Sequence, residues 1–510
     1  MCLPNKVTID HDDLRIEELV AVARYHAQLE LADEVKARIV HGRSLVERFV
    51  FEERVVYGIT TGVGDNARVK ISTADSKELQ KNLIMSHACG VGEPLAQEQV
   101  RAIIMMMIQS LSQGYSGVRL ETVEALVSLL NHEITPLVPK EGSLGYLSHQ
   151  AHISLVLLGM GEAICDGRQM SGREALHSCG LEPIELFEKE GLSLINGTVD
   201  MTALGALAVY DAINLLKTAD IVSMISFEAL KGTYRAYDPR IARVKRHPGI
   251  QKTIENIQQL IKGSEIAERF KDYRTQDALS IRSIPQIHGA SKDVVAFVRE
   301  VIEREINSAS DNPLVFDEHG GVAISSANCH GESVAMAMDM LAMAITEISN
   351  VSERRIFRLV SPQYSGHPAF LVDKSGVHSG YMIPQYTAAA LVSDNKVLSH
   401  PASVDSIPTT AGQEDHVSMG TSAALKAVKV IGNTENVLGI EWMCSSQALE
   451  FMQPLKPGVG TAAAYHLFRQ HVPPLEQDRV LSPDIRQAAD LIRSGKLVGL
   501  IEEEIGELQV

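Results

Sequence analysis

One segment, EGSLGYLSHQAHISL at residues 141–155, combines glycines with side chains that can exchange protons. Gly142 and Gly145 favour a tight turn, and the apolar residues that follow predict a helix directly after it. Tyr146 and Ser148 fall in the turn, a position where loops often carry catalytic groups. The segment is either a catalytic turn or one that has lost its chemistry.

A second glycine-containing segment, VYGITTGVG at Val56–Gly64, holds Tyr57. Its glycines would let the loop close over a bound molecule and exclude water. A tyrosine acts as a base near neutral pH only if its pKa is lowered, and a bound cation nearby would help. The alternative is a surface turn with a packing tyrosine; a phosphate loop is disfavoured because the lysine of that motif is absent.

Other polar residues suit the binding of a small anion or a ring. A guanidinium fork such as that of Arg282 suits a carboxylate, and a structural ion pair is the alternative. Asparagines such as Asn196 and Asn312 commonly cap loops, and residues such as His87 and Glu414 are often ordinary core and surface residues. The histidines show no spacing such as HExxH, so no metal is expected.

These residues require long helices to position them. Helical periodicity dominates the chain, with two short strand signals at Lys6–Ile9 and Val315–Ile324, so the predicted fold class is mostly α. The predicted helices are Leu95–Leu111, Leu120–Leu130, Met201–Leu230, Glu332–Glu353 and Thr421–Phe451. We expect an N-terminal helical region over 1–200 and a long-helix bundle over 201–510, which do not fold independently.

Composition narrows the classes of partner. The net charge of −17 argues against nucleic acid or an anionic membrane as the main partner. The six cysteines form no CxxC pair, and no signal peptide is visible, so we expect a cytoplasmic protein. The apolar stretch 201–230 contains charged residues, which favours a buried bundle helix over a membrane span.

Several motifs, in order, resemble the histidine/phenylalanine/tyrosine ammonia-lyase family. They cover nearly the whole chain: VYGITTGVG, LQKNLIMSHACGVGEPL, LINGT, SDNPLVF, SERRI, HPASVDSIPTTAGQEDHVSMGTS and DRVLSPDI. Together they are specific, whereas each alone is weak. The resemblance implies an all-α fold of the ammonia-lyase type and a homotetramer whose active sites are built from several chains. The contexts of His87 and Glu414 are closest to the imidazole-binding side of the histidine enzymes.

The family's electrophile, a methylidene-imidazolone, forms by cyclisation of an Ala-Ser-Gly tripeptide, and this chain departs from that pattern. Alignment places Tyr146, Leu147 and Ser148 on the tripeptide. The middle residue must lose water, which leucine cannot do, and the third position suits glycine. A shifted register, Leu147-Ser148-His149, supplies the serine but puts histidine at the third position. No prosthetic group or other cofactor is therefore expected.

The resemblance also implies roles for residues. Tyr57 corresponds to the base that removes the β-proton, Arg282 to the carboxylate clamp, and Asn196 and Asn312 to polar substrate contacts. His87 and Glu414 would hold the ring. Further candidates are Gln413 as a support for these residues, Tyr146, then Tyr386 and Asp200, as walls of a cation pocket, and Lys374 near the ring substituent.

The missing electrophile suggests a substrate whose amine needs none. A trimethylammonium group leaves as a neutral amine, so a betaine is expected. The electrophile-lacking branch of the family implies ergothionase activity, the elimination of trimethylamine from ergothioneine to give thiourocanate. The alternatives are a lyase for another betaine such as hercynine, an inactive homologue that binds an imidazole metabolite, and an ordinary ammonia-lyase whose electrophile forms in another way.

Overall fold

The computed structural model describes residues 3–10 and 13–510, and it divides into two compact units. Unit 1 comprises residues 1–210, 299–339 and 401–425, and unit 2 comprises residues 211–298, 340–400 and 426–510. Both units are discontinuous in sequence. The expected division, by contrast, was a single boundary after residue 200.

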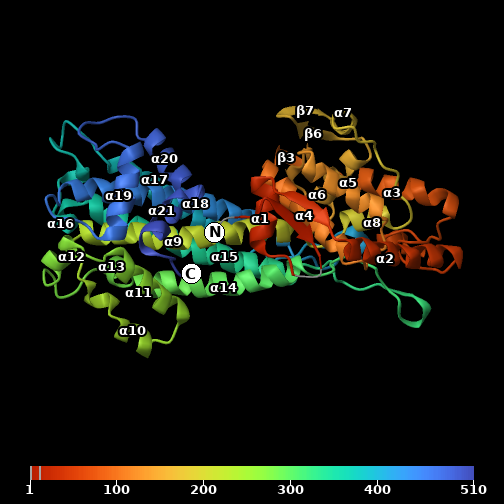
Figure 1. The fold of residues 1–510 in the computed structure, drawn as a ribbon, viewed down its shortest axis with the longest axis horizontal. Helices are drawn as coiled ribbons and strands as arrows, with labels where there is room; N and C mark the ends of the chain where they lie inside the picture. Colours follow the sequence, from red (N-terminus) through yellow and green to blue (C-terminus); the bar gives the residue numbers. More distant parts are fainter. Residues whose placement is uncertain (1–2, 11–12) are drawn as a thin grey trace. The chain divides into compact units, whose positions relative to one another are not determined.

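Helices make up most of the described chain, which confirms the predicted fold class (Figure 1). Unit 1 contains α1 (Ile16–Tyr25), α2 (Asp33–Phe51), α3 (Thr73–His87), α4 (Gln97–Ser112), α5 (Leu120–Asn131), α6 (Ser148–Leu157), α7 (Gly172–Ser178) and α8 (Glu190–Ile195). Unit 2 contains α10 (Pro239–Val244), α11 (Pro248–Leu260), α12 (Glu265–Phe270), α13 (Leu279–Arg282), α16 (Pro362–Ser365), α17 (Met382–Leu398), α19 (Val459–His471), α20 (Ser482–Arg493) and α21 (Lys496–Ile505).

Four longer helices contain residues of both units. They are α9 (Val199–Ala229), α14 (Ile284–Ile306), α15 (Glu332–Val360) and α18 (Gly420–Glu450). The predicted stretches 201–230 and 421–451 match α9 and α18 within two residues, and 332–353 matches the first part of α15, because long runs of Ala, Leu, Met and Ile without proline favour helix. Short 3₁₀ turns lie at Gly64–Arg68 (η1), Tyr234–Tyr237 (η2), Glu318–Gly320 (η3), Ala369–Leu371 (η4) and Thr410–Gly412 (η5).

The strands are short and belong to unit 1. A parallel pair joins β1 (Lys6–Ile9) to β2 (Gln28–Leu31), and β3 (Val91–Pro94) pairs antiparallel with β5 (Pro139–Glu141). A three-stranded antiparallel sheet has the order β4 (Thr135–Pro136), β6 (Glu162–Cys165), β7 (Arg168–Ser171), and α7 packs beside β6 and β7 (Figure 1). The last pair is β8 (Leu314–Phe316) with β9 (Val322–Ile324).

Two helical stretches, Glu190–Ala229 and Glu332–Val360, are long and apolar enough to cross a membrane. Their most apolar windows are 100% and 61% buried inside the fold. Core helices of a bundle have the same composition, since they are covered on most faces. This burial accords with the prediction that residues 201–230 form a bundle helix.

Several helix ends of unit 1 carry residues that the sequence singles out. α3 ends at His87, α6 begins at Ser148, and α18 begins at Gly420, shortly after Glu414. α8 ends at Ile195, directly before Asn196. Since orphan backbone groups at helix ends must find partners, these junctions are rich in polar contacts.

Candidate active site

The segment 142–148 is a strained turn directly before α6. Leu147 has φ 82° and ψ −68°, and the Ser148 N–H donates to the Tyr146 carbonyl at 3.3 Å. This is a three-residue γ-turn of the form with positive φ, which is rare for a residue with a side chain. Gly145 also has positive φ (154°), and a Cβ there would lie 2.9 Å from Met201 Cε and from Ser418 Oγ. Packing therefore holds the turn in a conformation that its sequence does not favour.

This turn decides whether residues 146–148 fit the family's electrophile. The contraction is centred on Leu147, and α6 begins at Ser148. The alignment from the sequence predicts Tyr146, Leu147 and Ser148 at the tripeptide position. The backbone thus has the tight shape that brings a third residue's nitrogen towards a first residue's carbonyl. Leucine nevertheless has no hydroxyl to lose as water, and Ser148 stands where glycine is needed. The residues present do not fit the methylidene-imidazolone.

A fully buried carboxylate, that of Asp200, anchors the turn. Its Oδ2 accepts from Ser143 Oγ at 2.9 Å, His149 Nδ1 at 3.1 Å and Thr421 Oγ1 at 2.7 Å. Burial opposes the charge on both partners, but their mutual contact lowers the pKa of Asp200 and raises that of His149. Because its oxygens are occupied by these donors, Asp200 is not free to line a cation pocket, as the sequence had suggested.

Tyr146 connects the turn to Glu414. Burial, followed by the nearby charge of Glu414, raises the pKa of Tyr146, so the phenol lies close to that carboxyl group. Glu414 Oε2 accepts from Thr409 Oγ1 at 2.9 Å and Thr410 Oγ1 at 3.0 Å. Tyr57 contributes weakly to the same shift, so Tyr146, Glu414 and Tyr57 belong to one neighbourhood.

Cys329 also lies in this neighbourhood. Burial and the charges of Asp311 and Glu414 raise the pKa of its thiol to about 11. The thiol is consequently neutral near pH 7 and is a poor nucleophile there. Tyr146, whose pKa is also raised, is likewise neutral near pH 7.

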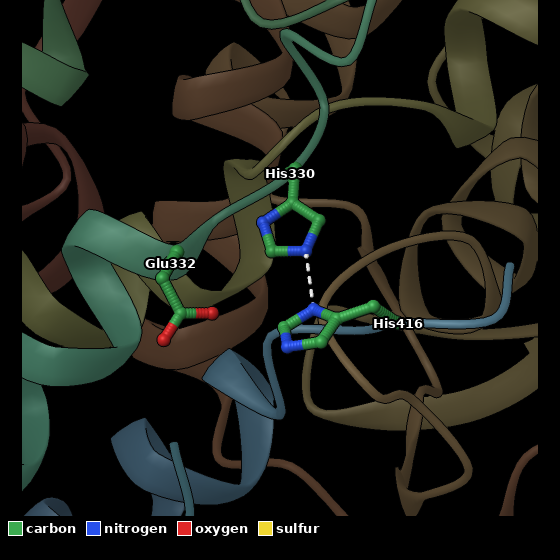
Figure 2. A group of neighbouring side chains, drawn as sticks. All are labelled: His330, Glu332 and His416. Carbon is green, nitrogen blue, oxygen red and sulfur yellow. Dashed lines mark hydrogen bonds between the residues drawn. The ribbon is translucent and has the colours of Figure 1, made fainter. Parts of the chain in front are cut away.

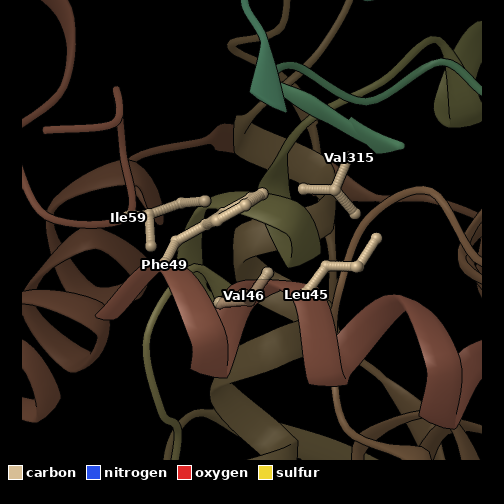
Figure 3. Close-up of a cluster of buried hydrophobic side chains, with 5 residues drawn as sticks. All are labelled: Leu45, Val46, Phe49, Ile59 and Val315. Atoms are coloured by element: carbon tan, nitrogen blue, oxygen red, sulfur yellow. The ribbon is translucent and has the colours of Figure 1, made fainter. Parts of the chain in front are cut away.

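The Tyr57 loop is held by the packing of Ile59 and by a backbone hydrogen bond to the Tyr57 oxygen. Ile59 packs against Leu45, Val46 and Phe49 of α2 and Val315 of β8 (Figure 3). The Tyr57 oxygen accepts from the Gly64 N–H at 3.0 Å, and Gly58 and Gly64 both have positive φ. The phenol oxygen therefore has a backbone donor, and its own O–H remains available to another group.

His87, the last residue of α3, has a defined ring orientation. Its Nδ1 lies 2.7 Å from the Leu83 carbonyl oxygen, which can only accept, so we assign the ring hydrogen to Nδ1. Nε2 is then an acceptor. A half-buried histidine in this state can bind an N–H donor such as an imidazole ring.

Asn196 and Asn312 meet at a buried ion pair that the sequence did not reveal. Lys189 Nζ lies 2.6 Å from Asp311 Oδ2, and both side chains are inaccessible to solvent or nearly so. Burial lowers the pKa of Lys189. Burial alone would raise the pKa of Asp311, but the charge of Lys189 has the larger combined effect with its hydrogen bonds, so the pKa of Asp311 is lowered. Asn196 Nδ2 donates to Asp311 Oδ1 at 3.1 Å and to the Asn312 carbonyl at 2.9 Å. The pair thus holds the two asparagines together.

The remaining predicted residues are exposed or belong to unit 2. Gln413 is exposed in unit 1. In unit 2, Arg282 at the end of α13 contacts the amide oxygen of Gln276 (Nη2–O 2.8 Å in the favourable amide orientation), a neutral acceptor that does not balance its charge. Tyr386 on α17 is 71% exposed, and Lys374 is exposed in the preceding loop. Unit 1 therefore brings Tyr57, Tyr146 and Glu414 together.

Comparison with known proteins decides the family. Residues 14–470 match the family described as "Aromatic amino acid lyase". The chain belongs to this family of carbon–nitrogen lyases. A protein of Alkaliphilus oremlandii named histidine ammonia-lyase is 50% identical over 507 residues, which is 99% of this chain and 100% of the relative. The crystal structure of histidine ammonia-lyase from Trypanosoma cruzi is 40% identical, with a TM-score of 0.92, over 98% of this chain and 96% of that one.

The same comparisons overturn the expected ergothionase activity. The structure of ergothionase from Treponema denticola has a TM-score of 0.91 but only 28% identity, over 97% of this lyase and 99% of that chain. This lyase is much more similar to proteins named histidine ammonia-lyase. The prediction of ergothioneine as substrate and of trimethylamine and thiourocanate as products was wrong, because it gave three residues at the turn more weight than the rest of the chain.

Proposed function

We propose that this lyase eliminates the α-nitrogen of histidine as ammonia and forms the conjugated imidazole acrylate, without the methylidene-imidazolone. The observation that carries the proposal is the 50% identity, over the full length, to a protein named histidine ammonia-lyase. The neighbourhood of Tyr57, Tyr146 and Glu414 supports it, because a base lies beside a group that can bind a ring N–H.

In the proposed reaction, the phenolate of Tyr57 removes the β-proton of the substrate. His87 Nε2 accepts one N–H of the substrate's imidazolium ring and Glu414 the other, so that the electron pair left at the β-carbon is spread into a cationic ring. Asn196 and Asn312 contact the carboxyl end, with Gln413 as a support. Arg282 is proposed to clamp the carboxylate through two parallel hydrogen bonds, the role that its motif has in the family. We further propose a cytoplasmic homotetramer that completes the sites.

The α-nitrogen leaves from its protonated form. A free amine is a poor leaving group, but an ammonium departs as neutral ammonia when the C–N electron pair moves onto nitrogen. The electrons of the broken β-C–H bond form the double bond, and the proton stays on Tyr57. Tyr146, which occupies the first tripeptide position, is proposed to contact this ammonium through its ring face. Tyr386 and Lys374 remain candidates for substrate contacts, without an assigned role.

Product analysis tests the proposal. The purified chain is incubated with histidine and, in parallel, with its N,N,N-trimethyl derivative, and both the conjugated acid and the released nitrogen compound are quantified. We expect histidine to give ammonia and the conjugated acid in equal amounts. Tyr57→Phe should form neither product. Turnover of the trimethyl derivative but not of histidine would contradict histidine as the substrate. Turnover of neither compound would contradict the proposed lyase activity and favour a protein that only binds its ligand.

A further inference from the structure

A group of three side chains in unit 1 has the composition of a metal site. His330 precedes α15, Glu332 is the first residue of α15, and His416 precedes α18. Their candidate ligand atoms all lie within 4.8 Å of one another. Figure 2 shows the Glu332 carboxylate pointing towards the two imidazole rings. The two histidines are 86 residues apart in sequence, so the absence of a local motif such as HExxH could not predict this group.

The two imidazoles are spaced as two ligands of one ion would be. His330 Nε2 lies 3.2 Å from His416 Nδ1. Two nitrogens at ~2.0–2.1 Å from a tetrahedral Zn²⁺ are about 3.3–3.4 Å apart. The rings are stacked, with centroids 5.4 Å apart. A carboxylate oxygen of Glu332 lies within 4.8 Å of both candidate nitrogens.

The carboxylate supplies the second, independent observation. Glu332 Oε2 is shielded from solvent and has no hydrogen-bond partner among the described residues. A shielded anionic oxygen without a donor is costly, which points to a missing cation or donor. A hydrogen bond between the histidines uses one nitrogen of each ring and leaves this oxygen unsatisfied. An ion between the three side chains would satisfy all of them at once.

We infer that His330, Glu332 and His416 bind one divalent transition-metal ion of the zinc type. Two imidazoles and one carboxylate are a donor set that suits such ions, and three protein ligands leave positions open for water or a small ligand. His416 is exposed and His330 is half-buried, so an ion can reach the site from solvent. This inference goes beyond the proposed function and does not depend on it.

Cobalt titration tests the site independently of activity. The untagged chain, in a Cys89→Ser background that removes an exposed thiol, is freed of metal with a chelator and titrated with Co²⁺. Ligand-field absorption reports the affinity, and elemental analysis after loading with Zn²⁺ reports the stoichiometry. We expect one ion per chain, and at least a ~100-fold loss of affinity in His416→Ala and Glu332→Gln, since even the loss of a residue that hydrogen-bonds to a ligand costs about 10–100-fold.

A matched control excludes adventitious binding. His177 is an exposed histidine beside a glutamate (Nε2–Oε2 of Glu182, 3.2 Å) outside the group, and His177→Ala should bind Co²⁺ like the parent. Circular dichroism and size-exclusion chromatography verify that each variant is folded. Failure of the parent chain to bind Co²⁺ and Zn²⁺, or equal affinities in all variants, would overturn the inference.

Discussion

Asp200→Asn should loosen the turn at residues 142–148. Both carboxylate oxygens act as acceptors: Oδ1 for the Met201 N–H at 2.7 Å, and Oδ2 for Ser143, His149 and Thr421. An asparagine therefore directs its NH₂ at a donor in either orientation. The substitution removes at least one charge-assisted hydrogen bond, which contributes about 1.5–3 kcal/mol. His149 can release its proton, so the larger cost of a stranded buried charge is avoided.

The assay is backbone hydrogen exchange in peptides that cover residues 142–152. A loss of about 1.4 kcal/mol in the free energy of local opening raises the opening equilibrium constant tenfold. Exchange in this segment should therefore accelerate about 10- to 140-fold relative to the parent chain. Asp220→Asn is the control. Asp220 is an equally buried carboxylate that accepts from His288 Nδ1 at 2.8 Å in unit 2, and its replacement should leave residues 142–152 unchanged.

The effect should depend on pH in a defined direction. His149 has a raised pKa, so its contribution to stability is complete below its unfolded value near 6.5 and is lost as pH rises through the folded value. Asp200 has a lowered pKa, so its contribution is present above 3.8 and is lost as pH falls through the folded value. The ratio of variant to parent exchange rates should be larger at about pH 6 than at about pH 9. Unchanged exchange in residues 142–152 at pH 6, or equal acceleration by Asp220→Asn, would refute the assigned anchor.

Three further predictions concern the chemistry. Tyr57→Phe should lower kcat about 10²–10⁴-fold, the usual contribution of a positioned base, while the affinity for a substrate analogue is retained; an unchanged kcat would remove Tyr57 from the mechanism. Arg282→Lys should lower kcat/KM about 10–100-fold through loss of the bidentate contact, and an unchanged value would contradict the clamp. Combined Tyr146→Ala, Leu147→Ser and Ser148→Gly should yield a peptide lighter by two water molecules with new near-ultraviolet absorption, because the γ-turn is already present; a folded variant of unmodified mass would contradict a pre-shaped turn.

The helices were predictable because their signal is local. The stretches 120–130 and 332–353 are rich in Leu, Ala and Met and match α5 and the first part of α15. β1 at Lys6–Ile9 also matches its predicted strand, since alternation over four residues is visible in the sequence. The turn at 142–148 was predicted from its glycines, but the γ-turn centred on Leu147 is visible only in the backbone torsions.

The contacts that hold the site together could not be read from the sequence. His149 and Asp200 are 51 residues apart, and Lys189 and Asp311 are 122 apart, with no motif that links them. Asp200 was considered for a cation pocket because only its neighbours in the chain were visible. The substrate prediction failed for a related reason. Leu147 indicates only whether the electrophile can form, whereas similarity over the full chain indicates which enzymes the chain resembles.

Nitrogen release from histidine by chemically unmodified protein tests the central claim most directly. Peptide mapping of the purified chain gives the mass of the segment that contains residues 146–148, and the same preparation is assayed for ammonia and the conjugated acid. We expect an unmodified Tyr146-Leu147-Ser148 segment together with ammonia release that depends on Tyr57. A segment lighter by two water molecules, or an unmodified segment with no ammonia release from histidine, would contradict it.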